Sequence, residues 1–134
     1  MTNKRILSIL CIVSMTVTCL NLLGKEALAG DFSGSCKDLK LTDGHVLSAT
    51  CKDRGANFRN TSLDLNSGIG NKDGHLITTG GYAGTCKNIG LNGNSLRADC
   101  KTYKGDWRST NLDLNRVISN QDGNLAFDDR EVIN

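Results

Sequence analysis

The sequence is poor in the residues on which most catalytic sites depend. Among its 134 residues only two are histidines, His45 and His75, and both sit among polar residues typical of turns. A nucleophilic triad needs a base that is held by an orienting group, and nothing in the sequence nominates such a pair. We therefore expect a protein without enzymatic activity, whose two histidines are solvated at the surface.

Metal-binding patterns are missing as well. A zinc site needs closely spaced cysteine pairs or histidines beside them, and the chain has neither. Two Asn-x-Asp-Gly stretches superficially resemble a calcium loop. However, Ile69 and Ile118 occupy a ligand position, and no glutamate closes either loop. We expect no metal and no cofactor.

An excess of positive charge is absent from the part of the chain that is expected to fold. The full chain carries a net charge of +2, but the N-terminal 29 residues contribute three basic residues and one acidic residue. Removing them leaves 13 residues of each sign. Binding to a phosphate backbone depends on concentrated positive charge. Nucleic acid is therefore not an expected partner.

Residues 1–29 have the pattern of a secretory signal peptide. Lys4 and Arg5 precede a mostly apolar run over residues 6–23, and Ala27-Leu28-Ala29 matches a signal-peptidase site. The alternative is a membrane anchor, although serines and threonines dilute the apolar run. We expect cleavage before Gly30, no membrane insertion afterwards, and a secreted or periplasmic protein.

What the sequence does contain is an internal repeat. Residues 34–77 recur at 84–127, first at an offset of fifty and then, after a one-residue deletion, of forty-nine. Between 51–76 and 100–125 there is no gap, and 13 of 26 aligned residues are identical. Such a period indicates two copies of one supersecondary unit, so a surface site should occur in two related versions. We assign a single domain over 30–134, with repeat one at 32–81, repeat two at 82–128 and a short tail at 129–134.

The local patterns predict short strands joined by polar turns. Apolar and small polar residues alternate over 46–51 and 96–100, as in half-buried strands. Leu63, Leu65 and Ile69 indicate a strand that runs into a single helical turn, and their counterparts in repeat two repeat the spacing. Asp-Gly dipeptides at 73–74 and 122–123 predict tight turns, each followed by a strand. We also expect Phe58 and Trp107 to fill equivalent parts of the core, and Gly80-Gly81 to form a flexible connection.

The four cysteines outside the leader are expected to form two disulfides. Three pairings are open to them, and the repeat symmetry favours one bridge inside each copy, Cys36–Cys51 and Cys86–Cys100. Each bridge would close a loop of about 15 residues and stabilise the fold by roughly 3 kcal/mol in the chain-entropy model. A domain of this size buries a limited core and benefits from such links.

The polar composition of the repeated turns suits a ligand made of hydroxyl groups. A sugar needs several fixed donors and acceptors, because each hydrogen bond only replaces one to water. Rigid turns lower the ordering cost of binding, and duplicated weak sites gain avidity on a multivalent glycan. A lectin is therefore one candidate class on composition alone.

These residues resemble the cyanovirin-N family of mannose-binding lectins. The resemblance rests on residues 60–67, on an Ile-x-Asn-x-Asp-Gly-x-Leu stretch that occurs twice, and on the four cysteines. It implies an all-β fold of two pseudo-symmetric halves, each a triple-stranded sheet plus a β-hairpin, with strands exchanged between repeats. It also implies a disulfide within each repeat and binding of Manα1-2Man termini of high-mannose oligosaccharides and of the glycoproteins that carry them. The alternative is a secreted structural or protein-interaction module that keeps the fold and has lost sugar binding.

The resemblance also implies two sugar sites, each joining the Asn-x-Asp turn of one repeat to the segment after the second cysteine of the other. The central site would comprise Asn71, Lys72, Asp73, Gly81, Gly84, Thr85, Lys101, Thr102 and Tyr103. The terminal site would comprise Ser35, Lys52, Asp53, Arg54, Asn120, Gln121 and Asp122. Turn formation alone is the alternative role for the asparagines and aspartates.

This chain departs from the protein after which the family is named. That protein has glutamates where Gly70 and Gly84 stand and an arginine where Tyr103 stands, so side chains that close over the sugar are missing. Tyr103 could instead stack its ring on a sugar face. The terminal site departs too, with Lys52 and Arg54 among the replacements; we expect these two to pair with nearby acids. We therefore rank the central site first.

The connection between repeats is the hinge at which family members exchange halves to form domain-swapped dimers. The family's namesake has a proline in this hinge, whereas this chain has Gly80-Gly81 and no proline at all. Glycine lets the chain turn back on itself, which favours the closed form. We expect a monomer, with a domain-swapped dimer as the alternative.

Overall fold

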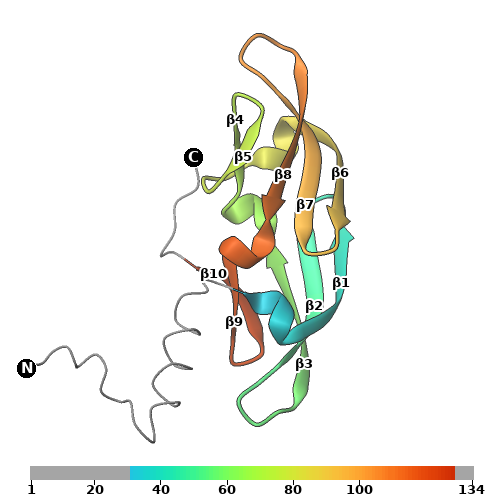
Figure 1. The fold of residues 1–134 in the computed structure, drawn as a ribbon, viewed down its shortest axis with the longest axis vertical. Helices are drawn as coiled ribbons and strands as arrows, with labels where there is room; N and C mark the ends of the chain where they lie inside the picture. Colours follow the sequence, from blue (N-terminus) through green and yellow to red (C-terminus); the bar gives the residue numbers. More distant parts are fainter. Residues whose placement is uncertain (1–30, 129–134) are drawn as a thin grey trace, which may run out of the picture.

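The two sequence copies fold as two three-stranded antiparallel sheets, each followed by a β-hairpin (Figure 1). The computed structural model describes residues 31–128; the expected signal peptide and the tail from residue 129 lie outside them. The first sheet has the order β1-β2-β3 and the second the order β6-β7-β8. Their strands are β1 Cys36–Thr42, β2 Val46–Lys52, β3 Phe58–Asp64, β6 Cys86–Asn92, β7 Ser95–Lys101 and β8 Trp107–Asp113. The hairpins are β4 Gly70–Lys72 with β5 His75–Ile77, and β9 Ile118–Gln121 with β10 Asn124–Phe127.

Single turns of 3-10 helix connect these strands and confirm the predicted switch from strand to helical turn. They are η2 Phe32–Gly34, η3 Leu65–Ser67, η4 Tyr82–Gly84 and η5 Leu114–Arg116. Asp64 caps η3 by accepting a hydrogen bond from the Asn66 N–H at 2.9 Å, and Asp113 caps η5 in the same way. No helix within residues 31–128 is long and apolar enough to cross a membrane.

Each hairpin packs on the sheet of the other repeat. The β5 strand lies against β8, and β10 lies against β3. The Leu76 N–H donates to Thr110 Oγ1 at 3.3 Å, and the Leu125 N–H donates to Thr61 Oγ1 at 3.1 Å. The exchange of elements between halves, expected from the family resemblance, is therefore confirmed.

The core lies between the sheets and hairpins and is built from alternate strand residues. In β2 the buried residues are Leu47, Ala49 and Cys51, and in β7 they are the matching Leu96, Ala98 and Cys100. Phe32 and Tyr82 hold equivalent places in the two copies, and both are fully buried. The Tyr82 hydroxyl donates to the Gly44 carbonyl at 2.6 Å, and burial raises the pKa of this hydroxyl.

Phe58 and Trp107 are not in the core, so that expectation was wrong. Their side chains are 49% and 45% exposed. The register pairs Phe58 with Lys52 and Trp107 with Lys101, each one residue beyond a buried cysteine. Because successive strand residues point to opposite faces, this register places both rings on the outer faces of their sheets.

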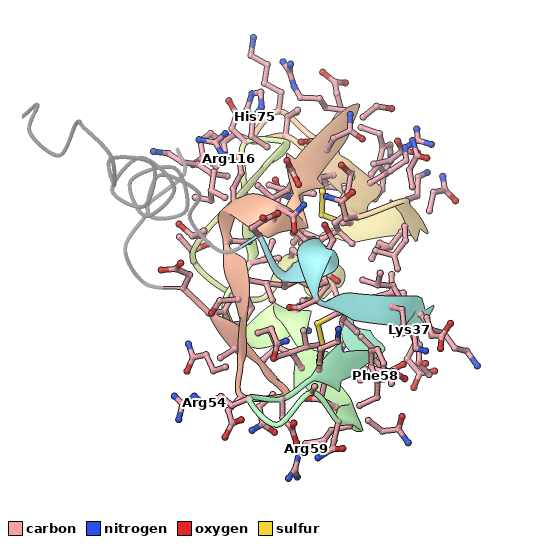
Figure 2. The ribbon with its side chains drawn as sticks, turned by 60° about the horizontal axis from the view of Figure 1, so that its bottom comes forward. Lys37, Arg54, Phe58, Arg59, His75 and Arg116 are labelled. Atoms are coloured by element: carbon pink, nitrogen blue, oxygen red, sulfur yellow. A yellow bond between two sulfur atoms is a disulfide. The ribbon has the colours of Figure 1, made fainter. Side chains whose placement is uncertain are left out.

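Lysine side chains cover these exposed rings. Lys37 Nζ lies 4.1 Å from the centroid of the Phe58 ring, and Figure 2 shows the two side chains together at the sheet surface. Lys87 Nζ lies 4.1 Å from the Trp107 ring in the second repeat. These cation–π contacts, each worth roughly 0.5–1 kcal/mol at exposed sites, partly compensate for the exposure of the rings.

The connection between repeats is anchored to the first repeat and is not the loose link that was expected. The Gly81 N–H donates to the Asn66 carbonyl at 2.8 Å, and the Tyr82 N–H donates to the Ile69 carbonyl at 3.1 Å. Gly81 has a φ of +78°, which favours glycine at this position. The chain therefore turns back at Gly81 and starts the second repeat beside the end of the first.

The structure confirms both predicted disulfides. Cys36 is bonded to Cys51 and Cys86 to Cys100, across sequence separations of 15 and 14 residues. Each bridge joins neighbouring strands of one sheet, where the two half-cystines are register partners. Cross-links therefore act within each repeat and not between them.

Candidate functional site

The two Asn-x-Asp-Gly stretches form the predicted hairpin turns. Asp73 and Gly74 occupy the tip between β4 and β5 and have φ values of +51° and +88°. Asp122 and Gly123 repeat this geometry, with φ values of +55° and +89°. Two consecutive positive φ values characterise the type I′ turn, which suits Asp-Gly. The turns therefore present their aspartates in one fixed conformation at the ends of the hairpins.

Asn71 fixes the central hairpin to the second repeat. Its Nδ2 donates to Thr85 Oγ1 at 3.0 Å and to the Lys101 carbonyl at 2.9 Å, while its Oδ1 accepts from the Gly74 N–H at 2.7 Å. Three segments that are distant in sequence thus meet at one amide. Both amide protons are used, so Asn71 positions the site and has no donor left for a ligand.

Asn120 does the same at the terminal hairpin. Its Nδ2 donates to Ser35 Oγ at 2.8 Å and to the Lys52 carbonyl at 2.9 Å, and its Oδ1 accepts from the Gly123 N–H at 2.8 Å. The two constellations match bond for bond. The pairing of each turn with the other repeat, which the resemblance implied, is present in the structure.

The turn aspartates bind the backbone of the facing loop. Asp73 Oδ1 accepts from the Tyr103 N–H at 2.8 Å, and Asp122 Oδ1 accepts from the Arg54 N–H at 2.9 Å. A carboxylate has about four lone-pair sites, so each aspartate keeps acceptor capacity beyond this bond. Both side chains belong to exposed residues, which makes that capacity available to a ligand.

Hydroxyl groups supply donors beside these acceptors. Thr85 accepts from Asn71, and Thr102 Oγ1 accepts from the Asp106 N–H at 3.1 Å, so each hydroxyl proton can point elsewhere. In the terminal half Ser35 is the counterpart of Thr85, since its hydroxyl accepts from Asn120. Gly81 and Gly84 border the central group, and open space surrounds the position that a Cβ would take at either glycine. A polyhydroxylated ligand could therefore approach the backbone here.

The predicted lysines Lys101 and Lys52 contribute mainly through their backbone. Their carbonyls accept from the two asparagines, whereas their side chains turn to the sheet surface. Lys101 Nζ lies 5.2 Å from the Trp107 ring centroid, and Lys52 Nζ lies 5.5 Å from that of Phe58. Lys72 and Gln121, at the tips of the hairpins, remain exposed.

Asp53, which was expected to contact the sugar, makes several contacts within the protein. Its Oδ1 accepts from the N–H groups of Gly55 and Asn57, and its Oδ2 lies 2.7 Å from Arg59 Nε. The Arg59 guanidinium and the Asn57 N–H hold the pKa of this carboxyl below its usual range. Lys52 and Arg54 were expected to pair with nearby acids, but the ion-pair partner of Asp53, the nearest acid in sequence, is Arg59. Sequence reasoning missed the role of Arg59, although the second repeat also has an arginine, Arg108, at the equivalent position.

His45 is partly exposed at the surface, with its side chain 32% accessible, and it also has a hydrogen-bond partner. Its Nδ1 lies 2.8 Å from Asp64 Oδ1, and this bond lowers the pKa of the Asp64 carboxyl. In the second repeat, Asn94 Nδ2 donates to Asp113 Oδ1 at 2.9 Å in the equivalent place. Because an asparagine serves the same purpose, this contact needs no proton transfer. Its role is to hold the strand ends together.

The two candidate sites lie at opposite ends of the molecule. In Figure 1 the β4–β5 hairpin and the β7–β8 loop share one end of the long axis, and the β9–β10 hairpin and the β2–β3 loop share the other. Figure 2 places His75 at one end and Arg54 and Arg59 at the other. Within residues 31–128 no group of three His, Cys, Asp or Glu side chains could hold a metal ion. The arrangement is suited to binding a neutral polar ligand twice.

Comparison with known proteins identifies this architecture. The family model described as the CVNH domain matches residues 32–129. The NMR structure of GzCVNH from Gibberella zeae is 33% identical to this chain, and the match covers 73% of this chain and 97% of that one with a TM-score of 0.67. TbCVNH from T. borchii is 30% identical over 72% of this chain and 98% of that one, with a TM-score of 0.65. A complex of microvirin with mannobiose is 32% identical over 73% of this chain and 98% of that one, with a TM-score of 0.64.

Proposed function

Because the chain belongs to the CVNH domain family, whose members are carbohydrate-binding lectins, we propose that it binds mannose-rich glycans at their Manα1-2Man termini. The observation that carries this proposal is the doubled constellation at the hairpin turns. In each, an asparagine locks the hairpin to the other repeat, and an aspartate presents an oriented, exposed carboxylate beside a hydroxyl. The similarity to microvirin, which was solved with mannobiose, supports the choice of sugar.

The central site is proposed as the stronger of the two. At this turn Asn71 binds the hydroxyl of Thr85, and Asp73 binds the N–H of Tyr103, the chain neighbour of Thr102. The Tyr103 side chain is 79% exposed. An exposed ring offers an apolar face on which the C–H groups of a sugar can stack. At the terminal site Arg54 replaces the ring, and the Asp53 carboxylate is already bonded within its own loop.

Replacing Asp73 by alanine should weaken mannobiose binding more than replacing Asp122, and the double substitution should abolish it. A charge-assisted bond from a sugar hydroxyl to a carboxylate is worth roughly 1.5–3 kcal/mol, or about ten- to a hundredfold in affinity. Isothermal titration calorimetry on both single variants and the double variant measures these losses. Equal losses would mean two equivalent sites, and a larger loss at Asp122 would reverse the ranking.

A matched variant separates the ligand role of Asp73 from its structural role. Asn at position 73 retains an Oδ1 that can accept from the Tyr103 N–H but loses the charge. If Asp73→Asn keeps the melting temperature of the parent and still weakens binding, the carboxylate contacts the sugar. A glycan array on the parent decides the broader question. Failure of every mannose-terminated glycan to bind at tens of micromolar protein would favour the alternative of a structural module that has lost sugar binding.

We further propose that the chain is exported, cleaved before Gly30 and secreted or periplasmic. The pattern of residues 1–29 supports export. The two disulfides also support it, because disulfides persist in oxidising compartments and are rare in the cytosol.

We propose a monomer as the working form. Opening the hinge into a domain-swapped dimer would have to break the anchoring of Gly81 on Asn66 and of Tyr82 on Ile69. Native mass spectrometry of the exported protein should show a single species of residues 30–134 with two disulfides. A dimer that persists on dilution would contradict the closed form, and retention of the leader would contradict export.

A further inference from the structure

A groove opens beside the central site, on the side of the hairpin that faces β8. It has a volume of about 410 Å³ and lies between the β5 strand and the edge strand β8. Its lining residues are Lys72, Asp73, His75, Leu76, Ile77, Tyr103, Thr110 and Asn111. At about 30 Å³ for each water in the liquid, this volume corresponds to roughly a dozen waters, enough for one hexose ring with its hydroxyls.

The groove is continuous with the central site. Lys72, Asp73 and Tyr103 line the groove and also belong to the residues proposed to bind the terminal disaccharide. Asp73 stands at the boundary, since its Oδ1 already holds the Tyr103 N–H at 2.8 Å. A glycan bound at the turn can therefore extend past the aspartate into the groove without crossing a wall of protein.

The lining has the chemistry that a pyranose ring requires. Tyr103 provides a 79% exposed ring, and the nearly buried Ile77 provides an apolar floor. Thr110 Oγ1 accepts from the Leu76 N–H, so its hydroxyl proton is available to a ligand. His75 and Asn111 are exposed polar residues whose side chains form no hydrogen bond within residues 31–128. They are therefore available to bind sugar hydroxyls.

The equivalent positions of the terminal half lack this lining. At the offset of forty-nine, Asn124 replaces His75 and Ala126 replaces Ile77. Likewise, Arg54 replaces Tyr103 and Ser62 replaces Asn111, so the apolar floor, the ring and the longer amide are all lost. The asparagine and aspartate contacts are the same at the two ends of the molecule. The ends therefore differ most in the residues on the groove side of the turn.

We infer that this groove binds one further hexopyranose unit of a glycan whose terminal disaccharide occupies the central site. The central half then recognises a longer oligosaccharide than the terminal half does. This inference rests on the proposed lectin function and adds to it the specificity-determining residues His75, Ile77 and Asn111.

The test compares α1-2-linked mannobiose and mannotriose by calorimetry, with one site active at a time. Asp122→Ala leaves the central site, and Asp73→Ala leaves the terminal site. With the central site alone, mannotriose should bind about three- to tenfold more tightly than mannobiose, from one or two added hydrogen bonds. This exceeds the twofold advantage that mannotriose has from containing two α1-2-linked disaccharides. With the terminal site alone, no more than that twofold advantage is expected.

The residues of the terminal half supply matched substitutions. In the Asp122→Ala background, His75→Asn combined with Asn111→Ser should reduce the advantage of mannotriose over mannobiose to the statistical factor of about two and leave mannobiose affinity unchanged. Both side chains are exposed, so the melting temperature should not move. In NMR spectra of the parent, the Asn111 side-chain amide should shift with mannotriose and not with mannobiose.

The outcomes separate the two proposals. If mannobiose and mannotriose bind the central site equally, or if the double substitution changes neither affinity, the groove inference is overturned while the lectin function stands. If the substitution weakens mannobiose as much as mannotriose, the groove holds the disaccharide itself and the inference is again overturned. If neither sugar binds the parent, the proposed function fails, and the inference fails with it.

Discussion

Replacing all four half-cystines by serine is expected to leave a chain that is largely unfolded at 37 °C. The bridges close loops with sequence separations of 15 and 14 residues. In the chain-entropy model each such loop contributes roughly 3 kcal/mol, so both together contribute about 6 kcal/mol. The whole free energy of unfolding of a domain is typically about 5–15 kcal/mol. Circular dichroism during urea titration of the parent and of the four-serine variant measures the loss.

The two single-bridge variants provide the internal control. Because the loops are nearly equal in length and lie in different sheets, removing Cys36–Cys51 or Cys86–Cys100 should cost similar amounts, and the two losses should add. A four-serine variant that melts within a few degrees of the parent would show that the packed core suffices without the bridges.

Gly70→Ala is expected to be the most damaging single-methyl addition near the central site. A Cβ at this position would overlap Thr79 Oγ1 and would lie 2.6 Å from the carbonyl oxygen of Gly80 and 2.8 Å from its nitrogen. The Thr79 side chain can rotate away, but the backbone of Gly80 cannot move without displacing the connection between the repeats. Overpacking of this kind costs about 1–3 kcal/mol, and more where the backbone must shift. Thermal unfolding followed by circular dichroism measures it.

Two further variants test this explanation of Gly70. Gly84→Ala should leave the melting temperature close to that of the parent, because open space surrounds that position and its φ is not in the left-handed region. Gly70→Ala combined with Thr79→Ala should recover only part of the loss, since the contact with the Gly80 backbone remains. Full recovery in the double variant would locate the strain in the threonine side chain alone.

The same contact explains a difference from the family pattern. The protein after which the family is named has glutamate in the place of Gly70, and a side chain there would collide with the connection as this chain folds it. The equivalent residue of repeat two is Ser119, which carries a side chain and forms an isolated bridge with Asp31. A glycine is therefore needed in one copy and not in the other.

The sequence by itself was sufficient to predict the hairpin turns, the disulfide pairing and the switch from strand to helical turn. The Asp-Gly dipeptides predicted both hairpin turns, because few other residue pairs accept two consecutive positive φ values. The repeat predicted the disulfide pairing, since each cysteine pair recurs inside one copy. The spacing of Leu63, Leu65 and Ile69 predicted the strand that ends in a helical turn.

Tertiary structure alone decided which faces and which partners these elements have. Phe58 and Trp107 lie outside the core because the register pairs them with Lys52 and Lys101, and a shift of one residue reverses the face of a side chain. That register is set by partners across the sheet and leaves no mark in the local pattern. The packing of each hairpin on the other repeat came only from the family resemblance, because both copies carry the same contact residues, and a hairpin could pack on either sheet. The connection between the repeats passes close to Gly70 and excludes a side chain at that position. The groove beside Asp73 also depends on tertiary structure, because it forms only where β5 packs against β8.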